Sequence, residues 1–171
     1  MTKTRNMISL AAITLALTVP LAAQKPAKIP SDPEVATKLK ELKSIAGDKK
    51  FTQDAKGVQI IDELIQKQEK GLNAQDQKSI VKGLDSLLNK GRLRPATKAQ
   101  IYNATAEALG RHGKAGAKVL KSAYEKKRFP KKRDWVSLRE KLLINIGRTK
   151  EESMVKFLLD EARRSPEAAL M

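Results

Sequence analysis

The chain has 171 residues, a formal net charge of +16 from 35 basic and 19 acidic side chains, and no cysteine. This length favours one domain, and the lack of cysteine excludes disulfides, a thiol nucleophile and cysteine-ligated metals. Aromatic residues make up only 4% of the chain, while Ala, Leu, Lys and Glu are abundant, which favours helices over a sheet. The positive excess attracts polyanions of any kind without choosing among them.

Residues 1–23 are typical of a secretory signal peptide. Lys3 and Arg5 precede an apolar run over residues 7–19, and small residues follow it. The run is shorter than the roughly 20 residues that span a membrane, although an uncleaved membrane anchor is the alternative. We predict cleavage near Ala23, and therefore an exported protein, periplasmic or secreted, without a membrane span after cleavage.

The folded domain is expected to begin after a flexible leader over residues 24–31, "QKPAKIPS", which holds two prolines and little apolar pattern. Asp32 is a capping residue, Pro33 suits the first helical position, and Glu34 places an acid in the first turn. These three residues predict a helix that ends at Gly47.

Six further stripes of apolar residues follow at helical spacing. They run over Val58 to Ile65, Ile80 to Leu88, Ile101 to Leu109, Ala117 to Ala123, Trp135 to Ile146 and Met154 to Ala162. The sequence therefore predicts seven helices of about 12 to 17 residues each and an all-α fold.

Two stretches of the chain are similar to each other. Gly110-Arg111 and Gly147-Arg148 each follow an apolar helix end and precede a second amphipathic helix with a basic end. Their spacing of about 37 residues, with two helices per period, is typical of an α-solenoid, in which each unit buries its apolar stripe against its neighbours.

Three short motifs resemble those of HEAT-like repeats. "ATAEALG" at 104–110 is similar to the end of their second helix, and Asp32 to Val35 and Ser165 to Ala168 are similar to the turn between their paired helices. The resemblance covers residues 32–171. It implies about three and a half antiparallel helix pairs, a surface for non-covalent binding, and an array that is truncated near Met171. Tetratricopeptide repeats are the alternative, but they need more aromatic packing positions than one Trp and two Tyr provide.

The stretch "EKKRFPKKRDW" at 125–135 is the most basic part of the chain. Pro130 is expected to end one helix, Asp134 to cap the next, and Trp135 to enter the core, which leaves Phe129 as the one ring that can be exposed. Stacking of repeats would bring this loop to the same edge as "GRLRP" at 91–95. The candidate partner-binding residues are Lys126, Lys127, Arg128, Lys131, Lys132 and Arg133, supported by Arg92 and Arg94.

The sequence favours a non-catalytic, exported scaffold that binds an acidic protein or another anionic macromolecule outside the cytoplasm and uses no cofactor. The only histidine, His112, is expected in a solvated turn, and one His without Cys makes neither a usual zinc site nor a catalytic triad with a recognisable serine motif. Three alternatives stay open: a nucleic-acid-binding helical repeat protein, a loop that contacts lipid headgroups, and a small enzyme of the HEAT-like class.

Overall fold

The computed structural model describes residues 29–126, 128–131 and 133–164, and within these ranges it contains helices and no strand. This confirms the all-α prediction. The predicted signal peptide and the second turn motif from Ser165 lie outside the described residues. The α-helices are α1 (Pro33–Gly47), α2 (Asp54–Glu69), α3 (Ala74–Asp85), α4 (Gln100–Leu109), α5 (Gly113–Glu125), α6 (Val136–Arg148) and α7 (Val155–Arg164).

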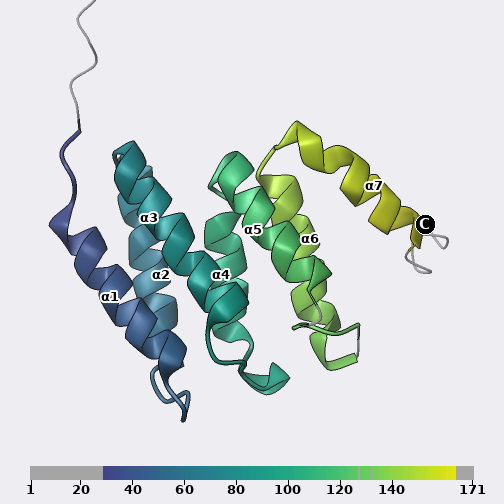
Figure 1. Cartoon of the computed structure of the whole chain (residues 1–171), viewed down its shortest axis with the longest axis horizontal. Helices are drawn as coiled ribbons and strands as arrows, with labels where there is room; N and C mark the ends of the chain where they lie inside the picture. The colour runs from purple at the N-terminus through teal and green to yellow at the C-terminus, as the bar shows by residue number, and fades with distance from the viewer. Residues whose placement is uncertain (1–28, 127, 132, 165–171) are drawn as a thin grey trace, which may run out of the picture.

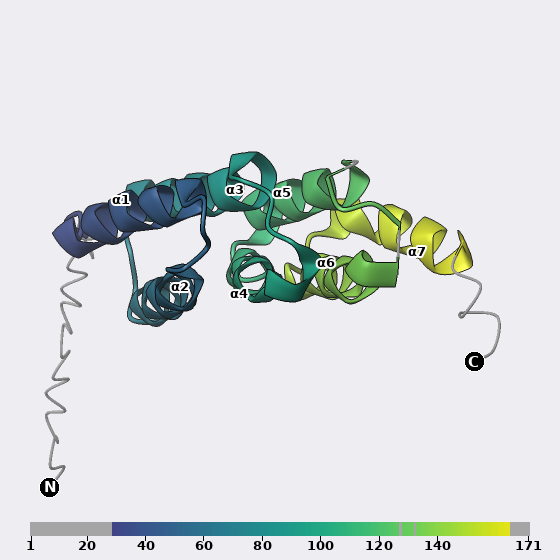
Figure 2. The same cartoon turned by 90° about the horizontal axis from the view of Figure 1, so that it is seen from below.

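The helices form two layers. Helices α1, α3 and α5 lie side by side in one layer, and α2, α4 and α6 lie side by side in the other (Figure 2). Contacts run along each layer, from α1 to α3 and from α2 through α4 to α6, and also between the layers. The apolar core lies between the layers, where helices α1 to α6 bury their stripes of Ile, Leu and Ala, whereas α7 has no buried residue.

The connections between helices gather at two opposite edges of the molecule (Figure 1). We call the first the loop edge, which consists of the long connections 48–53, 91–99 and 126–135. We call the second the turn edge, which consists of the connections 70–73, 110–112 and 149–154; the first two are shorter than any connection of the loop edge. Short 3₁₀ turns occur at both edges, at Ala96–Lys98, Arg133–Trp135 and Glu152–Met154.

The start of α1 is fixed as its sequence predicts. The Asp32 carboxylate accepts a hydrogen bond from the Glu34 backbone N–H at 2.9 Å, and Pro33 occupies the first turn. Asp76 of α3, which is buried, accepts hydrogen bonds from the Ser31 hydroxyl and the Asp32 backbone N–H, both at 2.8 Å. The N-terminal ends of α1 and α3 are therefore tied together by one carboxylate.

Helix α3 continues into a π-helical segment, Ser86–Lys90. Regular α-helical spacing would turn one of three consecutive residues toward solvent, but here Leu87, Leu88 and Asn89 are all buried. The Asn89 amide donates to the Asp85 carboxylate at 2.9 Å and to the Val119 carbonyl of α5 at 3.4 Å. The wider turn thus joins α3 to α5 just before the loop edge.

The start of α6 differs from its prediction. Trp135 is buried, as expected, but Asp134 does not cap the helix. Residues Arg133–Trp135 form a 3₁₀ turn instead, and Trp135 takes the position before α6 without a side-chain cap. The helix also runs through Gly147, its expected end, to Arg148.

No helix in the described part of the chain is both long enough and apolar enough to cross a membrane.

Candidate functional site

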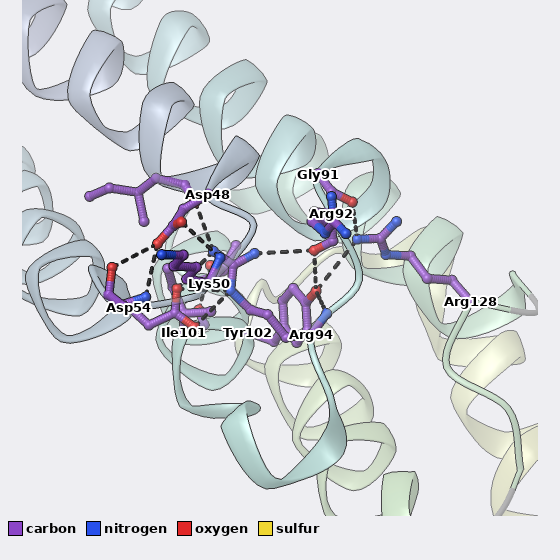
Figure 3. A network of polar contacts seen from close by, with 12 residues as sticks. Asp48, Lys50, Asp54, Gly91, Arg92, Arg94, Ile101, Tyr102 and Arg128 are labelled. Atoms are coloured by element: carbon purple, nitrogen blue, oxygen red, sulfur yellow. Dashed lines mark hydrogen bonds and ion pairs between the residues drawn. The ribbon is translucent and has the colours of Figure 1, made fainter.

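Neighbouring connections of the loop edge contact each other directly, and the sequence predicts that the second and third of them lie at the same edge. The Arg92 backbone N–H donates to the carbonyl of Ala46, at the end of α1, at 3.1 Å. Arg128 donates from its guanidinium to the carbonyl of Gly91, so the third connection reaches back to the second (Figure 3). The 3₁₀ turns of the second and third connections also touch each other.

Arg94 is the main link between the first two connections, and this corrects its predicted role as a surface residue. Its side chain has no exposed surface, and its Nε and Nη2 donate to the Asp54 carboxylate at 2.8–2.9 Å (Figure 3). Nη2 also donates to the Ile45 carbonyl at 2.9 Å. Burial by itself lowers the pKa of Arg94, but the hydrogen bonds and charge of Asp54 outweigh burial, so the pKa is raised.

Two rings enclose the Arg94 guanidinium. Its central carbon lies 5.2 Å from the ring centre of Phe51 and 5.8 Å from that of Tyr102. The Tyr102 hydroxyl accepts from the Arg94 backbone N–H at 3.0 Å and donates to the Arg92 carbonyl at 3.1 Å. Phe51 has a positive φ of 57°, a strained conformation for a residue with a side chain, and its contact with Arg94 helps to maintain it.

The third connection is anchored by aromatic packing and a second buried arginine. Phe129, expected to be the exposed ring, is fully buried, with its ring centre 5.1 Å from those of Tyr102 and Trp135. Arg139 of α6 lies over the Tyr124 ring at 3.9 Å and donates to the carbonyls of Tyr124 and Phe129 at 2.8 and 2.9 Å. The loop is therefore held at both of its ends.

The predicted basic residues divide into three groups. Arg92, Lys126 and Lys131 are exposed on the loop edge, as expected for contact with a partner. Arg94 is buried, and Arg128 is half-buried through its bond to Gly91. Lys127 and Lys132 lie outside the described residues, and of Arg133 only the backbone is described, in the 3₁₀ turn.

The structure adds three cations that the sequence reasoning missed. Lys49 and Lys50 lie in the first connection and Lys98 in the second, and all three are exposed. "GDKKF" at 47–51 precedes α2 as "GRLRP" precedes α4, but the two stretches lie 44 residues apart, so a repeat of about 37 residues does not point to it.

Most exposed cations of the edge face little opposing charge, but Lys126 and Lys131 share a pocket with Glu125, Asp160 and Glu161. None of Lys49, Lys50, Arg92, Lys98, Lys126 and Lys131 forms an ion pair with another described residue. Of the edge's carboxylates, Asp48 already accepts hydrogen bonds from the Lys50 and Thr52 backbone N–H groups, which lower its pKa, and Asp134 is exposed. The edge thus presents a strongly positive surface on a braced backbone.

His112 lies away from this edge, at the turn before α5, and its position differs from the solvated turn expected. The side chain is half-buried, its Nε2 has no hydrogen-bond partner among the described residues, and burial lowers its pKa. Acid–base chemistry needs a hydrogen bond that orients the ring, and Nε2 makes none with a described residue. Within the described ranges, no group of three or more His, Asp or Glu side chains is arranged to hold a metal ion.

Comparisons with protein-family models, with curated proteins and with solved structures return no match for this chain.

Proposed function

We propose that this chain is a non-catalytic scaffold of the HEAT-like, α-solenoid type, which is exported and binds an acidic protein through its loop edge. The observation that carries the proposal is the loop edge itself. Three successive connections display six exposed cations on a backbone that Arg94, Arg128 and Arg139 hold in place. A braced backbone favours binding because the connections lose little backbone entropy when the partner arrives.

The repeat architecture is supported by equivalent details in successive units. Pro95 and Pro130 each precede a 3₁₀ turn that leads into the next helix of the second layer. Tyr102 and Arg139, about 37 residues apart, hold the same place within their units. Each donates a hydrogen bond to a carbonyl of the connection before its own helix, Tyr102 to Arg92 and Arg139 to Phe129.

An acidic protein is favoured over a single-stranded nucleic acid because of the aromatic residues. Single-stranded nucleic acids bind through rings on which bases stack. Phe129 and Trp135 are buried, and Phe51 is engaged by Arg94. The edge therefore offers charge and few stacking surfaces, which suits carboxylates on a folded partner.

The test compares two variants with the same loss of charge. The edge variant replaces Lys49, Lys50, Arg92, Lys98, Lys126 and Lys131 with Gln. The control variant replaces six exposed lysines elsewhere with Gln, namely Lys40, Lys43, Lys56, Lys70, Lys141 and Lys156. Binding is measured against poly-glutamate and against a short DNA duplex over a series of salt concentrations, and by pull-down from an extracytoplasmic fraction.

We expect the edge variant to lose about tenfold or more in affinity for poly-glutamate and to show a flatter salt dependence, whereas the control loses much less. An equal loss in both variants would mean that net charge alone is responsible, and the edge proposal would be wrong. Preferential binding of the duplex by the wild-type chain would favour the nucleic-acid class instead.

Export is tested separately, because residues 1–28 lie outside the described part of the chain. N-terminal sequencing of the protein recovered from its native source should give a start near Gln24. Recovery from the cytoplasm with residues 1–23 intact would contradict the exported scaffold.

A further inference from the structure

A second surface, separate from the loop edge, lies between α3 and α5. It is a groove of about 580 Å³ that runs from the turn edge toward the π-helical segment. Its apolar part consists of Ala74 and Val81 on α3 and Ala115 and Val119 on α5. From Ala74 to Asp85 a helix rises about 16 Å, so the groove is as long as about three helical turns of a ligand.

Cations line the α3 side of this groove. Lys78 and Lys82 are exposed, one helical turn apart, and neither pairs with a carboxylate among the described residues. Like charges at this spacing repel each other and destabilise a helix slightly. The one carboxylate of the groove, Asp85, is already engaged by Lys90 at 3.0 Å and by Asn89. The groove therefore keeps an uncompensated positive charge beside an apolar floor.

The groove between α1 and α2 shows that this arrangement is not general in the molecule. That groove also holds lysines, but Lys38 pairs with Glu63, and Lys56 pairs with Glu41 at 3.0 Å. Its cations are thus neutralised within the chain. At the α3–α5 groove, the matching carboxylates would have to come from another molecule.

We propose that the α3–α5 groove is a docking site for an acidic amphipathic helix of a partner protein. The apolar face of that helix packs on Val81, Ala115 and Val119, and the small Ala115 allows close approach of the two backbones. Carboxylates one turn apart on the ligand helix pair with Lys78 and Lys82. The site differs from the loop edge because apolar burial adds a contribution that salt does not screen.

The probe is a fluorescently labelled synthetic helix with leucines on one face and glutamates on both sides of that face. Its control is a peptide of the same composition in scrambled order, and binding is followed by fluorescence anisotropy. The groove variants are Lys78→Gln with Lys82→Gln, and Ala115→Gln, which fills the floor at an exposed position with a good helix former. The matched control, Lys40→Gln with Lys43→Gln, removes the same charge from exposed positions on α1.

Because the glutamates of the probe can also bind the loop edge, the groove variants and the α1 control are tested in the background of the six-residue loop-edge variant. There we expect each groove variant to weaken binding of the amphipathic peptide by about tenfold, while the α1 control changes it less than about twofold. Part of the wild-type affinity should remain at high salt, and the scrambled peptide should bind more weakly. The proposal is overturned if the scrambled peptide binds equally well, or if the loop-edge variant by itself abolishes binding. Circular dichroism of each variant shows whether the fold is retained.

Discussion

The two edges of the molecule each contain an arginine that pairs with an acid about 40 residues away, and the two pairs differ in burial. At the loop edge, the side chains of Arg94 and Asp54 are 0% and 15% exposed. At the turn edge, those of Arg111 and Glu69 are 44% and 59% exposed. The same kind of pair is thus an internal brace at one edge and a solvated surface contact at the other, and only the environment distinguishes them.

At the turn edge, close backbone approach adds to the tie that buried Asp76 makes between α1 and α3. A Cβ atom on Gly116 would lie 1.9 Å from the Leu109 carbonyl oxygen, and one on Gly110 would lie 2.9 Å from the side-chain oxygen of Asn145. The two longest connections, 91–99 and 126–135, lie at the loop edge. Arg94 and Arg128 brace them, and their length leaves room to display exposed cations.

The largest expected effect comes from breaking the buried pair. Replacing Asp54 with Asn leaves the Arg94 guanidinium buried without its counter-charge, which should lower the free energy of unfolding by about 3–5 kcal/mol. Urea unfolding followed by circular dichroism measures this change. The double variant Asp54→Asn with Arg94→Met removes the stranded charge and should regain part of the loss. A change below about 1 kcal/mol for Asp54→Asn would contradict the role of Arg94 as a brace.

A smaller loss is expected at the turn edge from Gly116→Ala. The added methyl group meets backbone, which cannot rotate away, so α4 and α5 must separate slightly. We expect a loss of roughly 1–3 kcal/mol in the free energy of unfolding, despite the higher helix propensity of alanine. The control is Gly47→Ala, where an added Cβ has no neighbour within 4 Å. Equal stability of the two variants would show that the close approach does not constrain this edge.

The sequence predicted the parts of this structure that depend on local signals. The cap at Asp32 and the stripe that buries Trp135 depend on residues a few positions apart, and both are present in the structure. The position of Arg94 depends on Asp54, about 40 residues away, so "GRLRP" alone makes Arg92 and Arg94 look alike. The burial of Phe129 could not be predicted for the same reason, because its neighbour Tyr102 lies on α4, distant in the sequence.

The candidate site was predictable in outline and not in detail. A repeat of about 37 residues was enough to place the second and third connections at one edge. The pattern does not show which cations are used internally, because that depends on the packing of guanidinium groups against carbonyls of other helices and connections. Arg128, which reaches Gly91, and Arg139, which reaches Phe129, both belong to this class.

A modest pH effect is expected from His112, the only histidine of the chain. Burial lowers its pKa, so as pH falls below about 6.5 the unfolded chain takes up a proton before the folded protein does. The free energy of unfolding should therefore decrease between pH 7 and pH 5.5, by a few tenths of a kcal/mol to about 1 kcal/mol. The charged groups that share its groove are Lys78, Lys82, Asp85 and Arg111. The His112→Gln variant should lack this decrease. If its pH profile equals that of the wild-type chain, His112 is not the source of the decrease.

The smallest effect is expected at the exposed pair of the turn edge. Glu69→Gln removes the charge that faces Arg111, but water solvates the arginine that remains, so the free energy of unfolding should change by no more than about 0.5 kcal/mol. Measured under the same conditions as Asp54→Asn, this variant tests whether burial accounts for the difference in free energy of unfolding between the two ion pairs. A double-mutant cycle with Arg111→Gln gives the coupling within the pair, which should fall further as salt is added. A coupling near that of the buried pair would show that the turn edge, too, is braced by charge.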